Sequence, residues 1–458
     1  MLSDYWHFSV GLAQALALLM STTFLCYVFI ILRPYLRHKT QPEGRAQDFV
    51  WHLFVPCRDE AAVIDATLDN LLSAFDDAHV WVVDDASTDA TAQLVRSRMR
   101  DCDRLHLVSR TFPEARQGKG PALNAAYAAL DQSLAPDADR SKVIVGVIDA
   151  DGRLSANCLD VCAAPHHFGD EQVGSVQVAV RMINRDDPRP RPGGRIANWW
   201  GRLLVRMQDL EFRCAISALQ MTRKYTRTVG LGGNGQFSRL SALDDVRRAY
   251  GTPWHGALLE DYELGVHLML VGHRNAYTVD ALVDQEGLPD LRRLLTQRTR
   301  WGQGTMQCAT YIPQLWNSRK IPTIGVLEAT YYLLQPWMQI VGTVVYPVPM
   351  IIVAWNVMAD WTAMSGWFLG GGWMLLLLLI AMGLGPFLLW GPIYTRRCEP
   401  GIGLLRGLGF GLAYTVFIAT FYVTSWRALL RILQGRTGWS KTRRNAEIGH
   451  PGPVAVEA

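Results

Sequence analysis

The chain has 458 residues, which is more than one domain of ordinary size needs. Its hydrophobic fraction of 49% and charged fraction of 19% are close to average, and the net charge of +4 is too small to indicate nucleic-acid binding. The 8 cysteines form no CxxC pair, which predicts reduced thiols in the cytosol rather than a disulfide framework.

The first predicted element is an apolar segment with no charged side chain between Asp4 and Arg33. It is longer than the roughly 20 residues that are needed to cross a bilayer. A cleaved signal peptide would begin with basic residues and have a shorter apolar core, whereas this N-terminus carries Asp4. Arg33, Arg37 and Lys39 follow the segment, so this end is expected in the cytoplasm. We therefore predict a transmembrane helix and a basic flank within residues 1–39.

The region from 40 to 320 has the pattern of a cytoplasmic α/β domain, because short runs rich in valine and isoleucine alternate with amphipathic stretches. Strands are predicted at 49–55, 80–83, 105–108 and 143–148, and helices near 61–75, 88–99 and 121–130. Apolar strands separated by helices predict a mainly parallel sheet covered on both faces. Such sheets bind ligands at the carboxyl ends of their strands. The chain places acidic pairs at these ends: Asp59 and Glu60, Asp84 and Asp85, Asp149 and Asp151.

Asp149 and Asp151 come directly after the most hydrophobic predicted strand. Two carboxylates at this spacing suit a divalent cation that carries diphosphate oxygens, although surface loops also often contain an Asp-x-Asp sequence. Asp85 follows an earlier strand and could accept hydrogen bonds from a base or a ribose. Ser87 or Thr88 could at the same time cap the helix that follows.

Two further motifs combine charge with a predicted helix start. Lys119 lies between glycines in the sequence Gln-Gly-Lys-Gly-Pro, which suits either an anionic ligand or a flexible turn with a solvated lysine. Glu260 and Asp261 precede an amphipathic helix that runs to Leu270. They indicate either a general base for an attacking hydroxyl group or a solvated helix start.

The charged region closes on the sequence Gln-Arg-Thr-Arg-Trp, which contains Gln297, Arg300 and Trp301. Arginine can bind a phosphate group in a fork, and tryptophan can stack on a sugar ring. An amphipathic helix at the membrane surface is the alternative, since both residue types are common there. Four possible metal ligands lie close together in the sequence: Cys158, Cys162, His166 and His167. They lack the spacing of a zinc site, so a helix face followed by a turn is favoured over a metal site.

Three more charge-free runs, each long enough to span a bilayer, lie at 329–359, 361–395 and 407–426. Pro336 and Pro347 are expected to kink or split the first run, which could be interfacial or re-entrant instead. Three spans would place the tail, residues 434–458, outside the cell, but its basic residues favour the cytoplasm. We expect a cytoplasmic tail, with C-terminal transmembrane or interfacial helices within 321–433.

In this order, the motifs resemble those of the membrane-bound family-two inverting glycosyltransferases, which include cellulose, chitin, hyaluronan and poly-N-acetylglucosamine synthases. The matching sequences are Asp-Asp-Ala-Ser-Thr-Asp at 84–89, Asp-Ala-Asp at 149–151, Glu-Asp at 260–261 and Gln-Arg-Thr-Arg-Trp at 297–301. The resemblance covers roughly residues 48–301 and the membrane layout. It implies an α/β, GT-A-type nucleotide-sugar-binding domain with a mainly parallel sheet between N- and C-terminal transmembrane helices.

The resemblance also assigns a donor site by position. Asp59 and Asp85 would contact the nucleoside, and Lys119 would touch the diphosphate. Asp149 and Asp151 would hold Mg²⁺ or Mn²⁺, with Asp151 as the direct metal ligand. The residues expected to bind the donor are Asp59, Asp85, Lys119, Asp149, Gln297 and Arg300.

On the acceptor side, the resemblance makes Asp261 the catalytic base and places Trp301 at the acceptor end. The growing end of the acceptor is expected near a glycine-rich loop that contains Gly233, Asn234 and Gly235. Two residues depart from the commonest family pattern, namely Ala86 in place of glycine and Leu259 in place of threonine. Leu259 makes the surroundings of the base less polar.

A base for the nucleophile and a metal for the leaving group are sufficient for a single displacement, which would turn an α-linked UDP-sugar into a β-linkage. Two acceptors remain open: a growing polysaccharide, or a lipid such as diacylglycerol or ceramide that receives one sugar. A transporter or receptor with a soluble insert is disfavoured, because the predicted spans carry no acid or base for an ion path. The expected partners are the nucleotide-sugar donor, a glycan or lipid acceptor, the bilayer and possible accessory membrane subunits, but no nucleic acid. The expected location is the plasma membrane, with several spans and a cytoplasmic catalytic domain.

Overall fold

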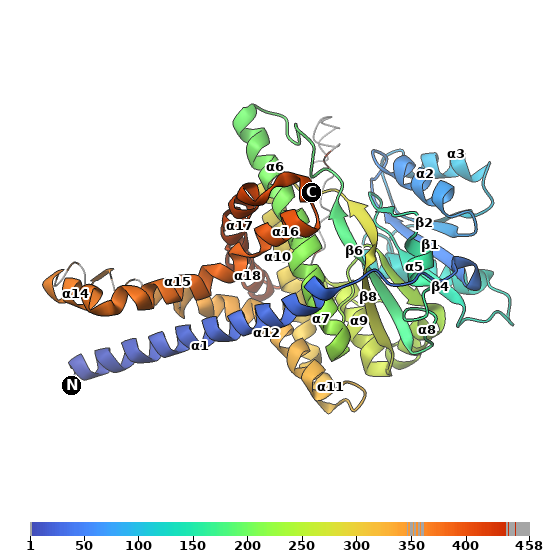
Figure 1. Cartoon of the computed structure of the whole chain (residues 1–458). Coiled ribbons are helices and arrows are strands. Elements are labelled where there is room, and N and C mark those ends of the chain that lie inside the picture. The colour runs from blue at the N-terminus through green and yellow to red at the C-terminus, as the bar shows by residue number, and fades with distance from the viewer. Residues whose placement is uncertain are drawn as a thin grey trace.

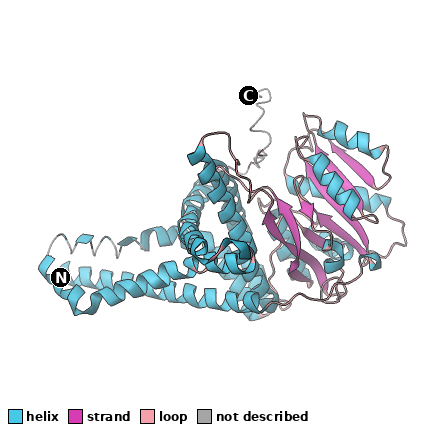
Figure 2. Ribbon diagram, turned by 45° about the horizontal axis from the view of Figure 1, so that its top comes forward, coloured by secondary structure: helices cyan, strands magenta, loops and turns pink. Residues whose placement is uncertain are grey.

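A computed structural model describes residues 2–436 except 346, 349–350, 352–353, 356–357 and 359–360, together with 438 and 445. Figure 1 shows two parts, an α/β domain and a group of helices that projects from one side of it. Figure 2 shows that the strands all lie in the α/β part. Most of the predicted basic tail, residues 434–458, lies outside the described residues.

The described residues form one eight-stranded sheet in the order β3-β2-β1-β4-β7-β6-β8-β5. The strands are β1 (Val50–Cys57), β2 (His79–Asp85), β3 (Leu105–Arg110), β4 (Val143–Val147), β5 (Arg153–Leu154), β6 (Val173–Met182), β7 (Gln236–Arg239) and β8 (Arg274–Gln285). The pairs β1–β2, β1–β4, β2–β3 and β6–β8 are parallel, whereas β4–β7, β6–β7 and β5–β8 are antiparallel.

The sheet is therefore mixed, and the mainly parallel arrangement that the sequence predicts is interrupted only at β7 and the short β5, since the other six strands run in one direction. The four predicted strands are β1 to β4, which are mutually parallel; β1, β2 and β4 are almost fully buried, and β3 at the edge of the sheet is half-buried. The later strands contain polar residues such as Gln177 in β6 and Asp284 in β8, so they lack the continuous apolar runs that identified the first four. Because β7 pairs with both β4 and β6 in the antiparallel sense, β6 and its parallel neighbour β8 run in the same direction as β1 to β4.

The register of the first strands aligns the loops that carry the predicted acids. Phe54 of β1 lies opposite Trp81 of β2 and Val147 of β4. The three strands run in the same direction, so their carboxyl ends meet at one edge of the sheet. That edge is where Asp85 ends β2 and where Asp149 follows β4.

Helices cover the sheet and extend beyond it. The helices of the α/β domain are α2 (Ile64–Ala74), α3 (Thr91–Met99), α4 (Lys119–Ser133), α5 (Cys158–Cys162), α6 (Arg195–Leu210), α7 (Ser217–Thr226), α8 (Leu240–Tyr250), α9 (Glu260–Val271), α10 (Leu291–Cys308) and α11 (Ile312–Asn317). A π-helical segment, η2 (Glu211–Ile216), joins α6 to α7, and such segments often occur at functional sites. Short 3₁₀ turns lie at η1 (Ala46–Asp48), η3 (Ala309–Tyr311) and η5 (Pro400–Ile402).

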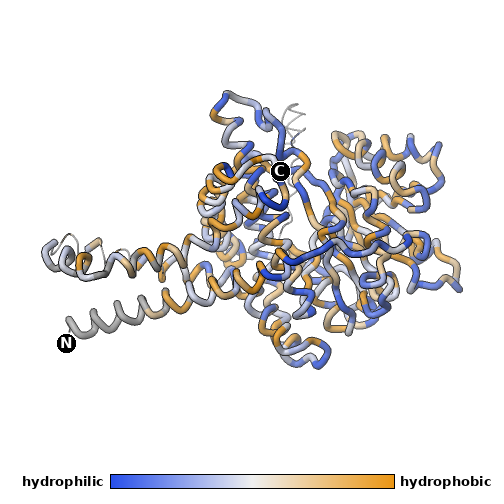
Figure 3. Tube along the Cα trace, viewed as in Figure 1, coloured by the Kyte–Doolittle hydropathy of each residue, from blue (hydrophilic) through white to orange (hydrophobic). Residues whose placement is uncertain are grey.

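The projecting helices are α1 (Leu2–Arg37), α12 (Thr323–Val345), α14 (Trp361–Trp367), α15 (Trp373–Leu388), α16 (Trp390–Arg397), α17 (Leu404–Ile418) and α18 (Thr420–Leu433), with a π-helical segment η4 (Phe368–Gly372) before α15. Hydrophilic colour is sparse along the arm formed by α14 and α15 (Figure 3). Among the described residues, one helical segment, Leu404–Leu433, is long and apolar enough to cross a membrane.

The other predicted spans remain predictions. The N-terminal span falls on α1, whose side chains before residue 15 lie outside the described part of the chain. The run at 329–359 falls on α12, which contains Pro336, and beyond it partly on residues that are not described. The run at 361–395 is divided among α14, η4, α15 and α16.

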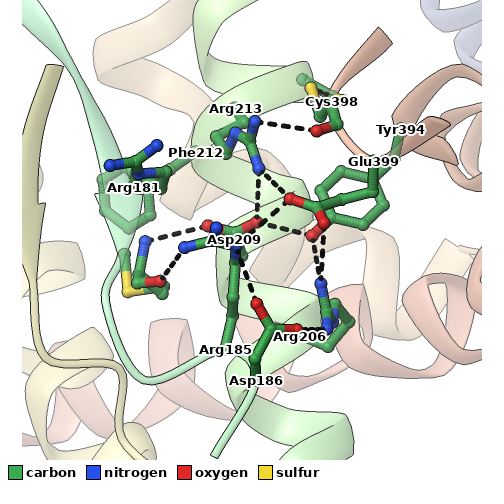
Figure 4. Close-up of polar contacts among 12 residues, drawn as sticks. Arg181, Arg185, Asp186, Arg206, Asp209, Phe212, Arg213, Tyr394, Cys398 and Glu399 are labelled. Carbon is green, nitrogen blue, oxygen red and sulfur yellow. Dashed lines mark hydrogen bonds and ion pairs between the residues drawn. The ribbon is translucent and has the colours of Figure 1, made fainter. Parts of the chain in front are cut away.

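A buried polar network joins these helices to the α/β domain (Figure 4). The carboxylate of Asp209 accepts hydrogen bonds from the amide of Met182 at 2.8 Å and the hydroxyl of Tyr394 at 2.5 Å. Arg213 on η2 bonds to Asp209 at 3.2 Å and to Glu399 at 2.5 Å. These bonds fix α16 against α6, η2 and the end of β6, so the two parts of the molecule are held in a defined orientation.

Candidate active site

A cavity of about 470 Å³ lies at the carboxyl edge of the first strands and continues to the projecting helices. Most of the residues predicted from the sequence line it. They are Asp85, Lys119, Asp149, Gly233, Asn234, Asp261, Gln297, Arg300 and Trp301. These residues are up to 216 positions apart in the chain, so the fold brings the four sequence motifs into one site.

Lys119 occupies the centre of the donor end, at the start of α4. Its Nζ lies 2.6 Å from Oδ1 of Asp149 and 2.5 Å from the carbonyl oxygen of Gly233. Burial lowers the pKa of the Lys119 ammonium, but the carboxylates of Asp149, Glu260 and Asp261 outweigh burial and raise the pKa overall. Lys119 therefore stays cationic at a helix start, where a diphosphate group can bind.

Asp261 and Glu260 begin α9 and are almost fully buried. Burial and the neighbouring Glu260 raise the pKa of Asp261 to about 7, against the opposing effect of Lys119. Oδ1 of Asp261 accepts a hydrogen bond from the amide of Tyr262 at 2.7 Å, which fixes the side chain. A buried carboxylate with a pKa near neutrality has the property required of a general base.

Gly233 lies between the donor end and Asp261. A Cβ atom added to this residue would lie 3.0 Å from Nζ of Lys119 and 3.2 Å from Oδ2 of Asp261. Its neighbour Asn234 accepts a hydrogen bond from the amide of Asp149 at 3.1 Å. The glycine-rich loop thus holds Lys119, Asp149 and Asp261 close together, because no side chain at Gly233 separates them.

The acceptor end contains an ion pair that sequence reasoning missed. Arg298 on α10 binds both carboxylate oxygens of Glu211 on η2, at 3.0 and 2.5 Å, and both residues are 4% exposed. The guanidinium of Arg298 also lies 4.3 Å from the ring centre of Trp301. Arg298 occupies a middle position of Gln-Arg-Thr-Arg-Trp, and an acid between two apolar residues, Leu210 and Phe212, was the available signal for Glu211.

Close packing fixes α10 against the loop before α9. A Cβ atom added to Gly304 would lie 2.7 Å from the backbone nitrogen of Leu259. The amide of Leu258 donates a hydrogen bond of 2.8 Å to the side-chain oxygen of Gln307. These contacts set the spacing between Trp301 on α10 and Asp261 on α9.

Three predicted site residues lie outside the cavity lining. Asp59 has φ +54°, and its Oδ1 accepts hydrogen bonds from the amide and hydroxyl of Thr88 at 2.6 and 3.0 Å, so it joins the loops after β1 and β2. Asp151 is buried, and its Oδ2 accepts a hydrogen bond from the amide of Glu286 at 3.0 Å. Gly235 has φ +72°, and a Cβ atom there would lie 2.7 Å from Val178. In this structure, all three support the loops behind the cavity.

Asp85 lines the cavity and is held in place by basic partners. Its Oδ1 accepts a hydrogen bond from the amide of Arg116 at 3.0 Å and forms an ion pair with the side chain of Arg110. Arg58 and Glu60, from the loop that contains Asp59, also line the cavity. This end of the cavity is therefore built from the loops after β1 and β2.

The donor set at Asp149 and Asp151 fits a hard divalent cation in its chemistry. Both are carboxylates at the end of β4, and Mg²⁺ and Mn²⁺ prefer oxygen ligands. Within the described residues, no group of three or more His, Cys, Asp or Glu side chains is placed to hold a metal ion. Two carboxylates would leave most coordination positions to diphosphate oxygens and water, as is usual for Mg²⁺.

Beyond Trp301, the cavity lining passes between α12 and α18. The residues there are Tyr332, Gln335, Pro336, Gln339, Phe421, Thr424 and Ser425. Ser425 donates a hydrogen bond of 2.6 Å to Gln339. Pro336 lacks an N–H group, so the carbonyl of Tyr332 loses its usual partner within the helix. Two predominantly apolar helices therefore present polar groups to the cavity.

Comparison with known proteins identifies the family of the chain. Residues 51–304 match the model of the family described as "Glycosyltransferase like family 2", and the chain belongs to this family. It is therefore a glycosyltransferase, as the motifs predicted. The assignment to the polysaccharide-synthase branch is finer than this match and remains a prediction.

Individual proteins show the same similarity. A beta-monoglucosyldiacylglycerol synthase of Synechocystis sp. is 30% identical over 260 residues, which cover 56% of this chain and 47% of the relative. The probable glycosyltransferase YdaM of Bacillus subtilis is 24% identical over 256 residues, which cover 55% of this chain and 54% of the relative. The chain spans about half the length of these curated relatives.

A solved structure shows the fold over nearly the whole chain. The mannosyltransferase PcManGT from Pyrobaculum calidifontis, in complex with GDP-Man and Mn²⁺, has a TM-score of 0.52 and 17% identity, and the alignment covers 93% of this chain and 98% of that one. The α/β domain is thus a GT-A-like fold with a mixed sheet.

Proposed function

We propose that the enzyme transfers one sugar from a nucleotide-sugar donor to a hydroxyl group of a membrane lipid, of the diacylglycerol or ceramide type, and forms a β-linked glycolipid. The observation that carries this proposal is the cavity, which joins a cationic donor end at Lys119 to a partly polar lining between α12 and α18. A lipid alcohol has a polar head on apolar chains, which matches that lining. The similarity to beta-monoglucosyldiacylglycerol synthases gives independent support.

The reaction is a single displacement with inversion. The acceptor hydroxyl oxygen attacks the anomeric carbon while the bond from that carbon to the diphosphate breaks. Asp261 accepts the hydroxyl proton, and the nucleoside diphosphate leaves with the electron pair of the broken bond. The product of an α-linked donor is therefore β-linked, and no covalent intermediate with the enzyme is required.

The side chains at the donor end bind and orient the leaving group. Lys119, Gln297 and Arg300 contribute hydrogen-bond donors toward the diphosphate, and Asp85 contacts the nucleoside. Asp59 acts from behind the lining, through the loops that it joins. Mg²⁺ or Mn²⁺ bound at Asp149 and Asp151 would offset negative charge on the leaving diphosphate.

The acceptor is held on the opposite side of the base. Trp301 offers a flat apolar surface with an N–H group at its edge, and Arg298 stacks on the ring. The loop of Gly233, Asn234 and Gly235 limits the space beside Asp261. An acceptor hydroxyl between these groups lies next to the base, and this arrangement lowers the entropic part of the barrier.

The membrane location is part of the same proposal. The segment Leu404–Leu433 and the predicted spans at 1–39 and 361–395 would anchor the enzyme in the plasma membrane, with the catalytic domain in the cytoplasm. The basic residues Arg33, Arg37 and Lys39 support this orientation of the N-terminal helix.

A β-linked polysaccharide is the second candidate product. It is favoured by Trp301, because an indole in the cavity lining can stack on the terminal sugar of a growing chain. Processive synthesis would then use the lining between α12 and α18 as a path for the polymer.

Product analysis separates the two candidates. Purified enzyme in lipid nanodiscs is given radiolabelled UDP-glucose, UDP-galactose, UDP-N-acetylglucosamine or GDP-mannose, with or without added diacylglycerol or ceramide. We expect the label in a single organic-soluble product whose formation depends on the added lipid. Label retained in a water-soluble or insoluble polymer would contradict the lipid acceptor and support the polysaccharide. The Asp261→Asn variant serves as the background control.

A further inference from the structure

The start of α6 and the loop before it form an exposed surface of aromatic and basic residues, which we call the tryptophan–arginine surface. Its members are Arg189, Arg195, Ile196, Trp199, Trp200 and Arg202. Ile196 is 76% exposed, and Trp199 and Trp200 are 51% and 50% exposed. Large contiguous apolar side chains at the surface of a protein mark an interaction site, and the proposed reaction does not use these residues.

The apolar side of this surface continues a stripe that is buried elsewhere. Ile196, Trp199, Trp200 and Leu203 follow the spacing of one helix face. Leu203 packs against a hydrophobic cluster that contains Met207 and residues of α1, α16 and α17. One stripe along α6 is therefore covered by the projecting helices at its C-terminal end and uncovered at its N-terminal end.

The basic side borders the same hollow as Trp199. Arg189, Arg195 and Arg202 are exposed and line this hollow, and Arg195 and Arg202 lie two helical turns apart on one side of α6. Arg191 instead forms an ion pair with Asp290 at 3.0 Å and faces the α/β domain. Exposed guanidinium groups beside indole rings suit the head-group layer of a bilayer, where phosphates bind arginine and indoles occupy the interface.

The position of α6 favours a bilayer over a protein partner. α6 contacts α17, which is the first half of the segment Leu404–Leu433 that is long and apolar enough to cross a membrane. In Figure 1 the free end of α6 extends past α16 and α17, on the side of the projecting helices. A bilayer that contains this segment therefore lies next to the uncovered stripe.

We propose that the tryptophan–arginine surface docks on the anionic leaflet of the membrane. Ile196, Trp199 and Trp200 enter the head-group layer, and Arg189, Arg195 and Arg202 bind the phosphates of anionic phospholipids. α6 continues directly into η2, which carries Glu211 and Phe212 of the active-site lining, so this contact orients the acceptor end toward the bilayer. The proposal depends on neither the sugar nor the acceptor of the proposed function.

Hydrogen exchange of the full-length protein tests the contact. The enzyme is placed in detergent, in nanodiscs of phosphatidylcholine, and in nanodiscs of phosphatidylcholine mixed with phosphatidylglycerol, and exchange is measured for the backbone amides of residues 193–204. We expect exchange to slow severalfold in the anionic nanodiscs relative to both other conditions. Equal exchange in the two kinds of nanodisc, or in anionic nanodiscs and detergent, would overturn the proposal.

Variants assign the effect to the side chains. Replacing Arg189, Arg195 and Arg202 by glutamine should remove the difference in amide exchange between anionic and neutral nanodiscs. The control is a triple variant of exposed arginines elsewhere, which should keep that difference: Arg96→Gln, Arg100→Gln and Arg153→Gln. Trp199→Ala with Trp200→Ala should restore fast exchange in nanodiscs, and the matching phenylalanine pair should retain part of the protection. Unchanged protection in the glutamine triple would show that the surface does not recognise lipid charge. Exchange of the β1 amides reports that each variant is folded.

Discussion

The buried carboxyl group of Asp261 predicts a specific pH dependence of sugar transfer. Burial and Glu260 raise its pKa to about 7, against the opposing effect of Lys119. A general base acts when it is ionised, so kcat/KM for transfer should rise as the pH increases through about 7 and fall below it. The Asp261→Asn variant should lack transfer at every pH while it binds the nucleotide-sugar normally in isothermal titration. A flat rate profile between about pH 5 and 8, as an aspartate of ordinary pKa would give, contradicts this role.

Gly233 is the second residue with a specific expected effect. A methyl group there would crowd Nζ of Lys119 and Oδ2 of Asp261, at 3.0 and 3.2 Å. We expect Gly233→Ala to reduce kcat about tenfold or more, because small displacements of catalytic groups have large effects on rate. Gly256→Ala is the matched control, since a Cβ atom there meets no heavy atom within 4 Å. If both variants retain full activity with normal thermal unfolding, the close approach of Lys119 and Asp261 is not required.

Asp151 tests the metal site, and two substitutions separate its possible roles. Asp151→Asn keeps an oxygen that can accept the hydrogen bond from the amide of Glu286, but it removes the charge. Asp151→Ala removes both. We expect each variant to lose the dependence of UDP binding on Mg²⁺ or Mn²⁺, measured by titration with and without EDTA, and only Asp151→Ala to lower the melting temperature. Metal-dependent UDP binding that survives in the asparagine variant argues against a carboxylate–metal contact.

At the scale of elements, the π-helical segment η2 and helix α10 act as one unit through Glu211 and Arg298. Burial raises the pKa of Glu211, and the guanidinium of Arg298 counteracts this rise. Removing one partner leaves the other buried and unpaired, which is expected to lower the free energy of unfolding by about 3 kcal/mol or more. Removing both partners is expected to lower it much less. Arg298 also stacks on Trp301, so the pair positions the acceptor surface.

A double-mutant cycle measures this coupling. Glu211→Gln and Arg298→Met should each destabilise the protein, and the double variant should be more stable than the sum of the single effects predicts. The KM for the lipid acceptor should rise in all three variants, while the KM for the donor stays close to normal. Additive losses of stability, or a defect confined to donor binding, would contradict the positioning role.

The contrast between the predicted and the missed elements has a physical basis. The strands β1, β2 and β4 are almost fully buried, so their sequences are mainly apolar, and the acids at or just after their ends could be located from the sequence. Asp149, Asp261 and Trp301 belong to local motifs, and all three line the cavity. The pair of Glu211 and Arg298 joins residues 87 positions apart, and only the folded chain brings them together. β6 and β8 were missed because their polar side chains interrupt the apolar runs by which the first strands were found.

At the scale of the whole molecule, the active-site cavity crosses the boundary between the α/β domain and the projecting helices. The polar network around Asp209 and Arg213 holds the two parts together on one side of η2, and the pair of Glu211 and Arg298 lies at the start of the same segment. In the proposed function, an acceptor would therefore reach Asp261 from the side of the projecting helices, away from Lys119. A lipid substrate requires such an arrangement, because its chains remain in the bilayer while its hydroxyl group reacts.

The amide side chains between α12 and α18 test this path. Gln335 and Gln339 line the cavity on α12, and Gln339 accepts a hydrogen bond from Ser425. Replacing both glutamines by leucine keeps similar bulk but removes the hydrogen-bond partners of a polar lipid head. We expect kcat/KM for the lipid acceptor to fall about tenfold or more, since each lost hydrogen bond costs about 1 kcal/mol. Slow hydrolysis of the donor by water should remain unchanged, because Lys119 and Asp261 are intact.

The control is Gln314→Leu, which changes an exposed glutamine on α11 outside the cavity lining. Initial rates are measured in nanodiscs at several lipid concentrations, and free sugar is quantified separately from glycolipid. A loss of transfer together with an equal loss of donor hydrolysis would place the defect at the donor end or in the fold. Unchanged transfer in the double leucine variant would mean that the acceptor reaches Asp261 by another route, and the lining between α12 and α18 would then have no part in acceptor binding.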